Sequence, residues 1–405
     1  MVKLLRQLTH KGIFYWLRVV ILTVLGTVFG HWLSDEQIWV DLRYKLYQQQ
    51  LDLAPRKPFA ERVVIVLIDD DDYWKGELGR RVPIKRSYLA KLVRALVAAN
   101  PAVIALDFDF ASPMADGSLI EHSDYQLERN EFLQTIRQAL ERTKIVLPKT
   151  IDFDADKNYI ITSDIHDGFD FGPKNQNLYM GYIALPYDVR RVPGTVKIHG
   201  AQPSVDSFAV AIAKAYDEVA LRRMPKSDSL PFGSYLRAEE FRQFSTRDVL
   251  QGQSRILDQL AHKIVIVGGA WHRQGHGRGS RIDSYFTPVG WIGGAFIHAN
   301  YVEAVLDGRV YSALNETIVT GLEIALVLLG AVVFALEIRP SVKWLAATAV
   351  CLVLLIISYF LFQNLGLFFE FFIPLLLIAG HSLLDQILEW RALARCYHAQ
   401  HEVHE

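Results

Sequence analysis

The stretch Arg62–Asp69, RVVIVLID, decides the fold of the middle of this 405-residue chain. It is apolar between its charged ends and rich in β-branched residues, which is typical of a strand covered on both faces. A helical period follows over Ser87–Ala99, and Ala102–Asp107 (AVIALD) is a second buried run. Because parallel neighbours need a crossover connection, this order predicts a parallel sheet.

Later segments extend the same pattern. They are a helix over 131–141, a strand Lys144–Pro148, a helix Asp206–Ala215, a strand Lys263–Gly269 (KIVIVGG) and a helix Ala295–Leu306. We therefore predict an α/β domain with a mainly parallel or mixed sheet over residues 34–313. The polar stretches 152–176 and 224–243 are expected to be surface insertions.

Long apolar segments lie at both ends of the chain. Each is close to the roughly 20 residues that cross a bilayer as a helix. They predict four transmembrane helices, one before the domain and three after it, over residues 12–33, 317–338, 344–362 and 367–388. A cleaved signal peptide is the alternative for the first, although His31–Glu36 makes a poor cleavage site. The cations flanking these segments predict that residues 1–11 and the tail 389–405 are cytoplasmic and that the domain is outside.

Composition excludes several classes of function. A net charge of -1 and 51% hydrophobic residues exclude a disordered tail and a nucleic-acid partner bound through bulk positive charge. Two cysteines exclude a disulfide scaffold. The sequence has no nucleophile elbow, phosphate-binding loop or kinase or cyclase signature. We therefore predict no enzymatic activity, no cofactor and no metal.

Polar residues follow the predicted strands, where ligands gather in open α/β sheets. Asp69, Asp107, Asp283 and Thr287 are the candidate ligand-facing residues. A structural alternative stays open for each, because acids at strand ends also cap helices and turns. A metal-dependent hydrolase that uses the same acids is a less favoured alternative. Glu323, inside the predicted segment 317–338, is a candidate for transmembrane coupling.

Short motifs also occur along the chain in a distinctive order. They are Val63–Asp69, Pro83 with Arg86, Ala102–Phe110, Gly181–Ile183, Asp188–Pro193, Ser207–Ala209, Phe244–Leu250, Lys263–Gly268, Asp283, Thr287-Pro288 and Gly294–Ala299. In this order the chain resembles the CHASE type-2 (CHASE-2) family of extracellular sensory domains, which are associated with cyclases and histidine kinases. It departs from the family pattern at Val82, where tryptophan is usual, and at Pro231–Gly233, where an Ile-Asn strand is usual.

The resemblance implies an external sensor with one membrane span before it, three after it and a signalling domain beyond. After residue 388 only 17 residues remain, from 389 to 405, too few for a catalytic domain. We therefore expect a bacterial inner-membrane sensor in contact with the lipid bilayer. It would detect an unknown external ligand or envelope condition and signal to a separate cytoplasmic partner. A scaffold subunit of an envelope complex is the alternative. Gly26 and Gly30, four residues apart, allow a homodimer.

Overall fold

The computed structural model describes residues 13–34, 60–81, 84–110, 124–153, 159–163, 169–185, 194–198, 204–219, 236–287, 289–308, 310–313, 316–335 and 340–365, with a few shorter pieces. The chain divides into two units. Unit 1 comprises residues 1–54 and 313–405, and unit 2 comprises residues 55–312. Each unit is described by itself.

Unit 2 is built on a seven-stranded sheet in which the stretch RVVIVLID forms the strand between β10 and the edge strand β9. The strand order is β4-β3-β2-β10-β1-β9, with β5 also paired to β3. The strands are β1 (Val63–Ile68), β2 (Val103–Leu106), β3 (Lys144–Phe153), β4 (Tyr159–Ser163), β5 (Leu178–Tyr182), β9 (Arg242–Ser245) and β10 (Ile264–Gly269). All pairs are parallel except β3 with β4. The predicted α/β domain with a mixed, mainly parallel sheet is confirmed.

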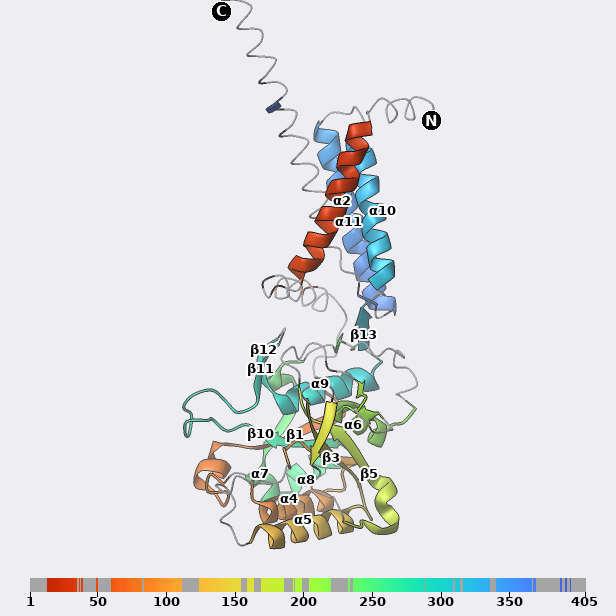
Figure 1. The fold of residues 1–405 in the computed structure, drawn as a ribbon. Coiled ribbons are helices and arrows are strands. Elements are labelled where there is room, and N and C mark those ends of the chain that lie inside the picture. The colour runs from red at the N-terminus through yellow and green to blue at the C-terminus, as the bar shows by residue number, and fades with distance from the viewer. Residues whose placement is uncertain are drawn as a thin grey trace, which may run out of the picture. The chain divides into compact units, whose positions relative to one another are not determined.

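Helices cover both faces of this sheet (Figure 1). One face carries α4 (Arg86–Ala98), α5 (Tyr125–Ala139), α7 (Thr246–Leu250) and α8 (Ser254–Leu260), and the other carries α6 (Phe208–Tyr216) and α9 (Gly294–Leu306). Successive residues of β1 alternate between the two cores: Val64 and Val66 join the first, whereas Val63 and Ile65 join the second. Both faces are apolar because both are buried.

The remaining elements of unit 2 are short. They are η1 (Asp71–Lys75), η2 (Gly172–Asn177), β6 (Thr195–Val196), β7 (Val205–Asp206), β8 (Phe232–Gly233), η4 (Ala238–Glu240), the hairpin β11 (Ser284–Thr287) with β12 (Gly290–Gly293), and β13 (Val310–Ala313), which reaches the border with unit 1. The two stretches predicted as surface insertions therefore contain regular structure: β4 lies within 152–176, and β8 and η4 lie within 224–243. Both predictions were too simple.

Unit 1 contains the helices α2 (Ile13–Ser34), α10 (Glu316–Ala335) and α11 (Pro340–Leu365) and the short strand β14 (Leu367–Phe368). Helix α10 contacts both α2 and α11. Three of the predicted membrane segments fall on these helices, and the fourth, 367–388, lies almost wholly outside the described residues.

The predicted four transmembrane helices are wrong. Across the described residues, no helix combines the length and the apolar character that a membrane crossing requires. Helix α10 ends at Ala335, three residues before the predicted segment does, and Arg18 of α2 and Glu323 of α10 are ionisable side chains of a kind that is costly inside a bilayer.

Candidate functional site

Two carboxyl groups meet at the carboxyl edge of the sheet, where β2 and β10 end. Asp107 directly follows β2, and its backbone N–H donates to the carbonyl oxygen of Val267 at 2.8 Å, so the sheet fixes its position. Its side chain is only 7% exposed. A Cβ at Gly268 of β10 would lie 2.6 Å from Ala295 Cβ and 3.6 Å from the Asp107 carboxyl. The absence of a side chain at Gly268 therefore lets α9 and Asp107 approach this strand closely.

Asp283 reaches the same place from the loop before β11. Its backbone is in the left-handed region, with φ of 52°. Its carbonyl oxygen accepts a 2.8 Å hydrogen bond from Gly294 N–H, at the first residue of α9. A Cβ on Gly294 would lie 2.0 Å from Asp283 Oδ2. Glycine is therefore required at 294, and the Asp283 carboxylate lies over the helix N-terminus, where the helix dipole favours negative charge.

His298 of α9 is the third polar group of this cluster. It is 2% exposed, its Nε2 lies 3.7 Å from Asp107 Oδ1, and its ring meets Phe208 edge to face at 5.2 Å. Its Nδ1 has no hydrogen-bond partner among the described residues. Burial lowers the pKa of His298 to about 4. The imidazole is therefore neutral at pH 7 and brings no positive charge to Asp107.

Both carboxyl groups are costly to ionise where they lie. Burial, and then the charge of Asp283, raise the pKa of Asp107 well above its usual value. Burial also raises the pKa of Asp283, opposed by hydrogen bonds from Tyr285 and Gly294 and by the charge of Arg273. Buried like charges cannot both ionise without a compensating cation. Chemically, this pair holds a proton or accepts a positively charged group.

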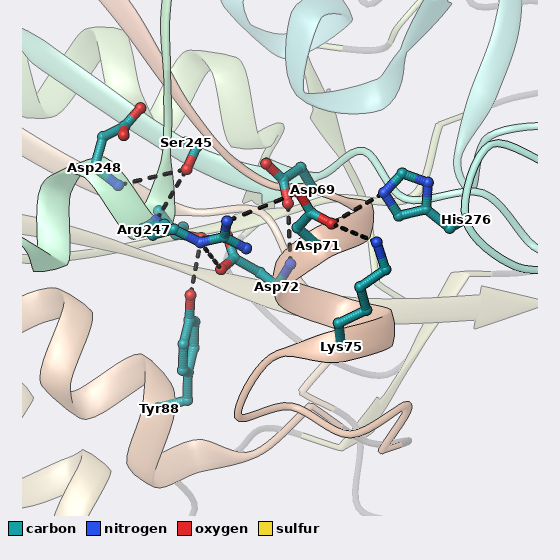
Figure 2. A network of polar contacts seen from close by, with 10 residues as sticks. Asp69, Asp71, Asp72, Lys75, Tyr88, Ser245, Arg247, Asp248 and His276 are labelled. Carbon is teal, nitrogen blue, oxygen red and sulfur yellow. Dashed lines mark hydrogen bonds and ion pairs between the residues drawn. The ribbon is translucent and has the colours of Figure 1, made fainter.

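Asp69 belongs to a second acidic cluster, at the ends of β1 and β9 (Figure 2). Its Oδ1 accepts a 3.0 Å bond from Asp72 N–H, and its carbonyl oxygen accepts one from the N–H of Tyr73, in the middle of η1. Asp72 accepts a 2.5 Å bond from the Thr246 hydroxyl, which in turn accepts from Tyr88. In this cluster the carboxylates are bound by neighbouring donors.

The loop after β10 docks onto this second cluster. The Asp70 carboxylate accepts bonds from His272 N–H at 2.7 Å and Gly277 N–H at 3.0 Å, and His272 Nδ1 lies 2.7 Å from its Oδ2. His276 Nε2 lies 3.0 Å from Asp71 Oδ1. Burial raises the pKa of Asp70, but the bonds from His272 and Gly277 outweigh it, and the net shift is downward. The described residues contain no group of three or more side chains suited to hold a metal ion.

A comparison with protein-family models identifies the chain: the CHASE2 domain model matches residues 19–336. The chain belongs to the CHASE2 family. CHASE2 is an extracellular or periplasmic sensory domain, as the sequence resemblance implied. No curated protein and no solved structure matched the chain.

The CHASE2 fold separates the five predicted site residues. It brings Asp107 and Asp283 together and leaves Asp69 in the second cluster. Thr287 closes the β11–β12 turn, where its hydroxyl donates to Gly290 carbonyl oxygen at 2.6 Å and accepts from Val289 N–H. Glu323 is buried on α10 in unit 1. Its coupling role remains a prediction, without the transmembrane segment on which it depended.

Sequence reasoning did not identify His298 and Tyr285 as neighbours of the Asp107–Asp283 pair. His298 stands in the apolar run GAFIHAN, which reads as a core helix, and Tyr285 stands in a short strand. The available signal was the histidine within an otherwise apolar helix. A lone histidine on such a helix is usually structural, and only its place 3.7 Å from Asp107 changes that interpretation.

A cavity of about 340 Å³ lies elsewhere in the CHASE2 domain, at the amino ends of the strands. It is lined by Ala60, Glu61, Val63, Val64, Arg242 and Lys263. Beside it, Glu303 near the end of α9 accepts from the N–H groups of Arg62 and Val63 at 2.8 and 2.9 Å. The Arg62 guanidinium also pairs with Asp307 at 2.6 Å. Thus α9 begins at the acid pair and ends where the chain enters β1.

Proposed function

We propose that this chain is a sensory protein whose CHASE2 domain detects an external stimulus at the Asp107–Asp283 pair and passes the signal to a separate effector protein. Because CHASE2 domains are extracellular or periplasmic, we place unit 2 outside the cytoplasm. The chain itself would catalyse no reaction. The observation that carries the proposal is the pair of carboxyl groups buried together beside a neutral imidazole.

The chemistry of the pair suggests a positively charged stimulus. A small cation placed between the two carboxyl groups would displace their proton and remove their mutual repulsion. The close packing at Gly268 and Gly294, where an added Cβ would lie 2.6 Å from Ala295 Cβ and 2.0 Å from Asp283 Oδ2, restricts the stimulus to a small cation. Asp69 and Thr287 would support the surrounding loops, because their described hydrogen bonds are local.

Helix α9 is the element that can carry the response. Its first residue, Gly294, contacts Asp283, and Glu303 near its other end holds the start of β1. A shift at the acid pair would therefore reach the start of β1. A ligand drives such a shift only through different affinities for two arrangements of the domain.

The test is thermal unfolding of the full chain in matched concentrations of Na⁺, Mg²⁺ and methylammonium chlorides. We expect one of these cations to raise the midpoint of unfolding for the wild type, and the increase to be lost in Asp283→Asn. The control is Asp258→Asn, an exposed aspartate of α8, which should keep the increase. Equal increases in all three proteins, or none in the wild type, would refute a cationic stimulus at this pair.

The separate effector needs its own experiment. The intact protein would be captured from its native cells after mild crosslinking and compared with a variant that lacks residues 389–405. We expect a kinase, cyclase or regulator to be captured and then lost with the tail. Recovery of envelope proteins alone, unchanged by the truncation, would favour a scaffold function instead.

A further inference from the structure

The β11–β12 hairpin exposes two aromatic rings on its outer face. Phe286 is 59% exposed and Trp291 is 72% exposed. They are direct partners across the two strands, with ring centroids 5.7 Å apart. The next pair along, Tyr285 and Ile292, packs into the core on the other face. The core therefore holds the inner face of the hairpin, and the aromatic pair projects outward with no covering element among the described residues.

Positive charge accompanies this aromatic pair. The preceding loop, residues 271–282, contains Arg273, Arg278 and Arg281 and no acidic residue. All three arginines are exposed. Backbone bonds from Arg273 to Ser280 and from Ile282 to Trp271 hold the loop as a narrow arm that turns at Gly275–Gly279. Arg278 and Arg281 form no ion pair with any described residue. Their charges are therefore available to a partner.

We propose that the hairpin docks onto an anionic lipid surface, with Phe286 and Trp291 in the interfacial layer and Arg278 and Arg281 against the lipid phosphates. Aromatic side chains are favoured at membrane interfaces, because the ring is apolar and its edge tolerates water. Basic residues add attraction to anionic headgroups. The loop that precedes the hairpin contacts Asp70 and Asp71 through His272, His276 and Gly277. The guanidinium groups of Arg278 and Arg281 are left for the charge complement that such a surface requires.

The small size of the aromatic patch favours a lipid over a protein partner. A stable protein interface buries about 800 Å² on each side, which two side chains do not supply. A lipid interface accepts such side chains without a shaped pocket. Because Asp283 lies three residues before Phe286, lipid contact would act on the segment that also carries the acid pair.

The test uses the full chain with vesicles of phosphatidylcholine alone or with one third phosphatidylglycerol. Three proteins are compared with the wild type: the aromatic variant Phe286→Ser with Trp291→Ser, the charge variant Arg278→Gln with Arg281→Gln, and the control Leu127→Ser. Leu127 is 69% exposed on α5 in the same unit. Co-sedimentation gives the lipid concentration at half-saturation, and binding through the rest of the chain is common to all four.

We expect the aromatic variant to need at least about tenfold more lipid, on the scale of losing two buried aromatic side chains. The charge variant should lose roughly fivefold per arginine on anionic vesicles and nothing on neutral ones. Leu127→Ser should bind as the wild type does. Quenching by brominated lipid, compared between the wild type and Trp291→Phe, isolates Trp291 among the eight tryptophans.

Three results would overturn the proposal. One is an aromatic variant that binds like the wild type with no loss of bromolipid quenching in Trp291→Phe. Another is an equal loss in Leu127→Ser, which would show that any exposed apolar residue suffices. The third is a wild-type dimer in light scattering that dissociates in the aromatic variant while vesicle binding is unchanged, which would assign the hairpin to a second copy of the chain.

Discussion

Two clusters of aspartates lie at the same edge of one sheet, and they differ in what surrounds them. Asp70 is held by two backbone N–H groups and the His272 ring, and its pKa is lowered. Asp107 is buried beside Asp283 and a neutral histidine, and its pKa is raised. Donors within the protein bind the carboxylates of the first cluster, whereas in the second cluster burial outweighs the charge of Arg273 and the hydrogen bonds to Asp283. The contrast teaches that the neighbours of an acid, more than the number of acids, distinguish a candidate binding site from a structural network.

The largest expected effect comes from filling the space beside Asp283. Gly294→Ala places a Cβ 2.0 Å from the Asp283 carboxyl, so we expect a loss of about 3 kcal/mol in the free energy of unfolding. Chemical denaturation measures it. Gly321→Ala, where a Cβ meets nothing within 4 Å, is the control. Adding Asp283→Gly, which keeps the left-handed backbone, should restore most of the loss; no restoration would place the clash elsewhere.

Protonation of His298 should lower the free energy of unfolding at acidic pH. Its pKa is about 4 in the folded protein against about 6.5 for an ordinary histidine, so the unfolded chain binds more protons between these pH values. The contribution of a neutral His298 is present above pH 6.5 and is lost as pH falls toward 4, by about 3 kcal/mol. Denaturation at several pH values should show this loss in the wild type and not in His298→Leu. Parallel profiles for the two proteins would contradict the assignment.

Removing the hydrogen-bonded carboxylate of Asp70 should also destabilise the protein, but less than the two changes above. Asp70→Ala leaves the N–H groups of His272 and Gly277 without their acceptor, and we expect a loss of about 2 kcal/mol at pH 7. Because the pKa of Asp70 is lowered, the difference from wild type should shrink as pH falls through the folded pKa. Lys75→Ala, which removes an exposed partner of Asp71, is the comparison and should cost little.

Neutralising the acid pair should have the opposite sign and the smallest effect. Asp107→Asn removes a buried group whose folded pKa is raised, so we expect a gain of about 1 kcal/mol at pH 8. The stability that protonated Asp107 gives is complete below the unfolded pKa and is lost as pH rises through the folded pKa. The advantage of Asn should therefore grow as pH rises from 4. A destabilised variant at pH 8 would mean that Asp107 has a partner which the geometry does not show.

The centre of the fold was predictable from sequence because its strands are buried on both faces. Three β-branched or apolar runs are recognisable as buried strands in the sequence. They are RVVIVLID, AVIALD and KIVIVGG, which form β1, β2 and β10 respectively. Strand β9, RQFS, was not predicted, because it is a short edge strand with two exposed polar residues.

The candidate site was predictable residue by residue but not as a pair. Strand-end position identified Asp107 and Asp283 separately. Their meeting depends on the left-handed backbone at Asp283 and on the close approach at Gly294, which no local pattern encodes. The hydrogen bonds that Asp70 accepts depend likewise on a loop about 200 residues further along the chain. The four consecutive aspartates would look the same in the sequence with or without those donors.

The position of β10 has a consequence for how the protein is made. This strand lies between β1 and β2, although it is synthesised long after both. Until the ribosome has released Ile264–Gly269, β1 and β2 lack the neighbour that joins them, and the backbone edges that would pair with it have no partner strand. Non-local pairing of this kind is slow and exposes the nascent chain to aggregation. A truncated product that ends before β10 should therefore accumulate on chaperones or be degraded, although it contains both β1 and β2.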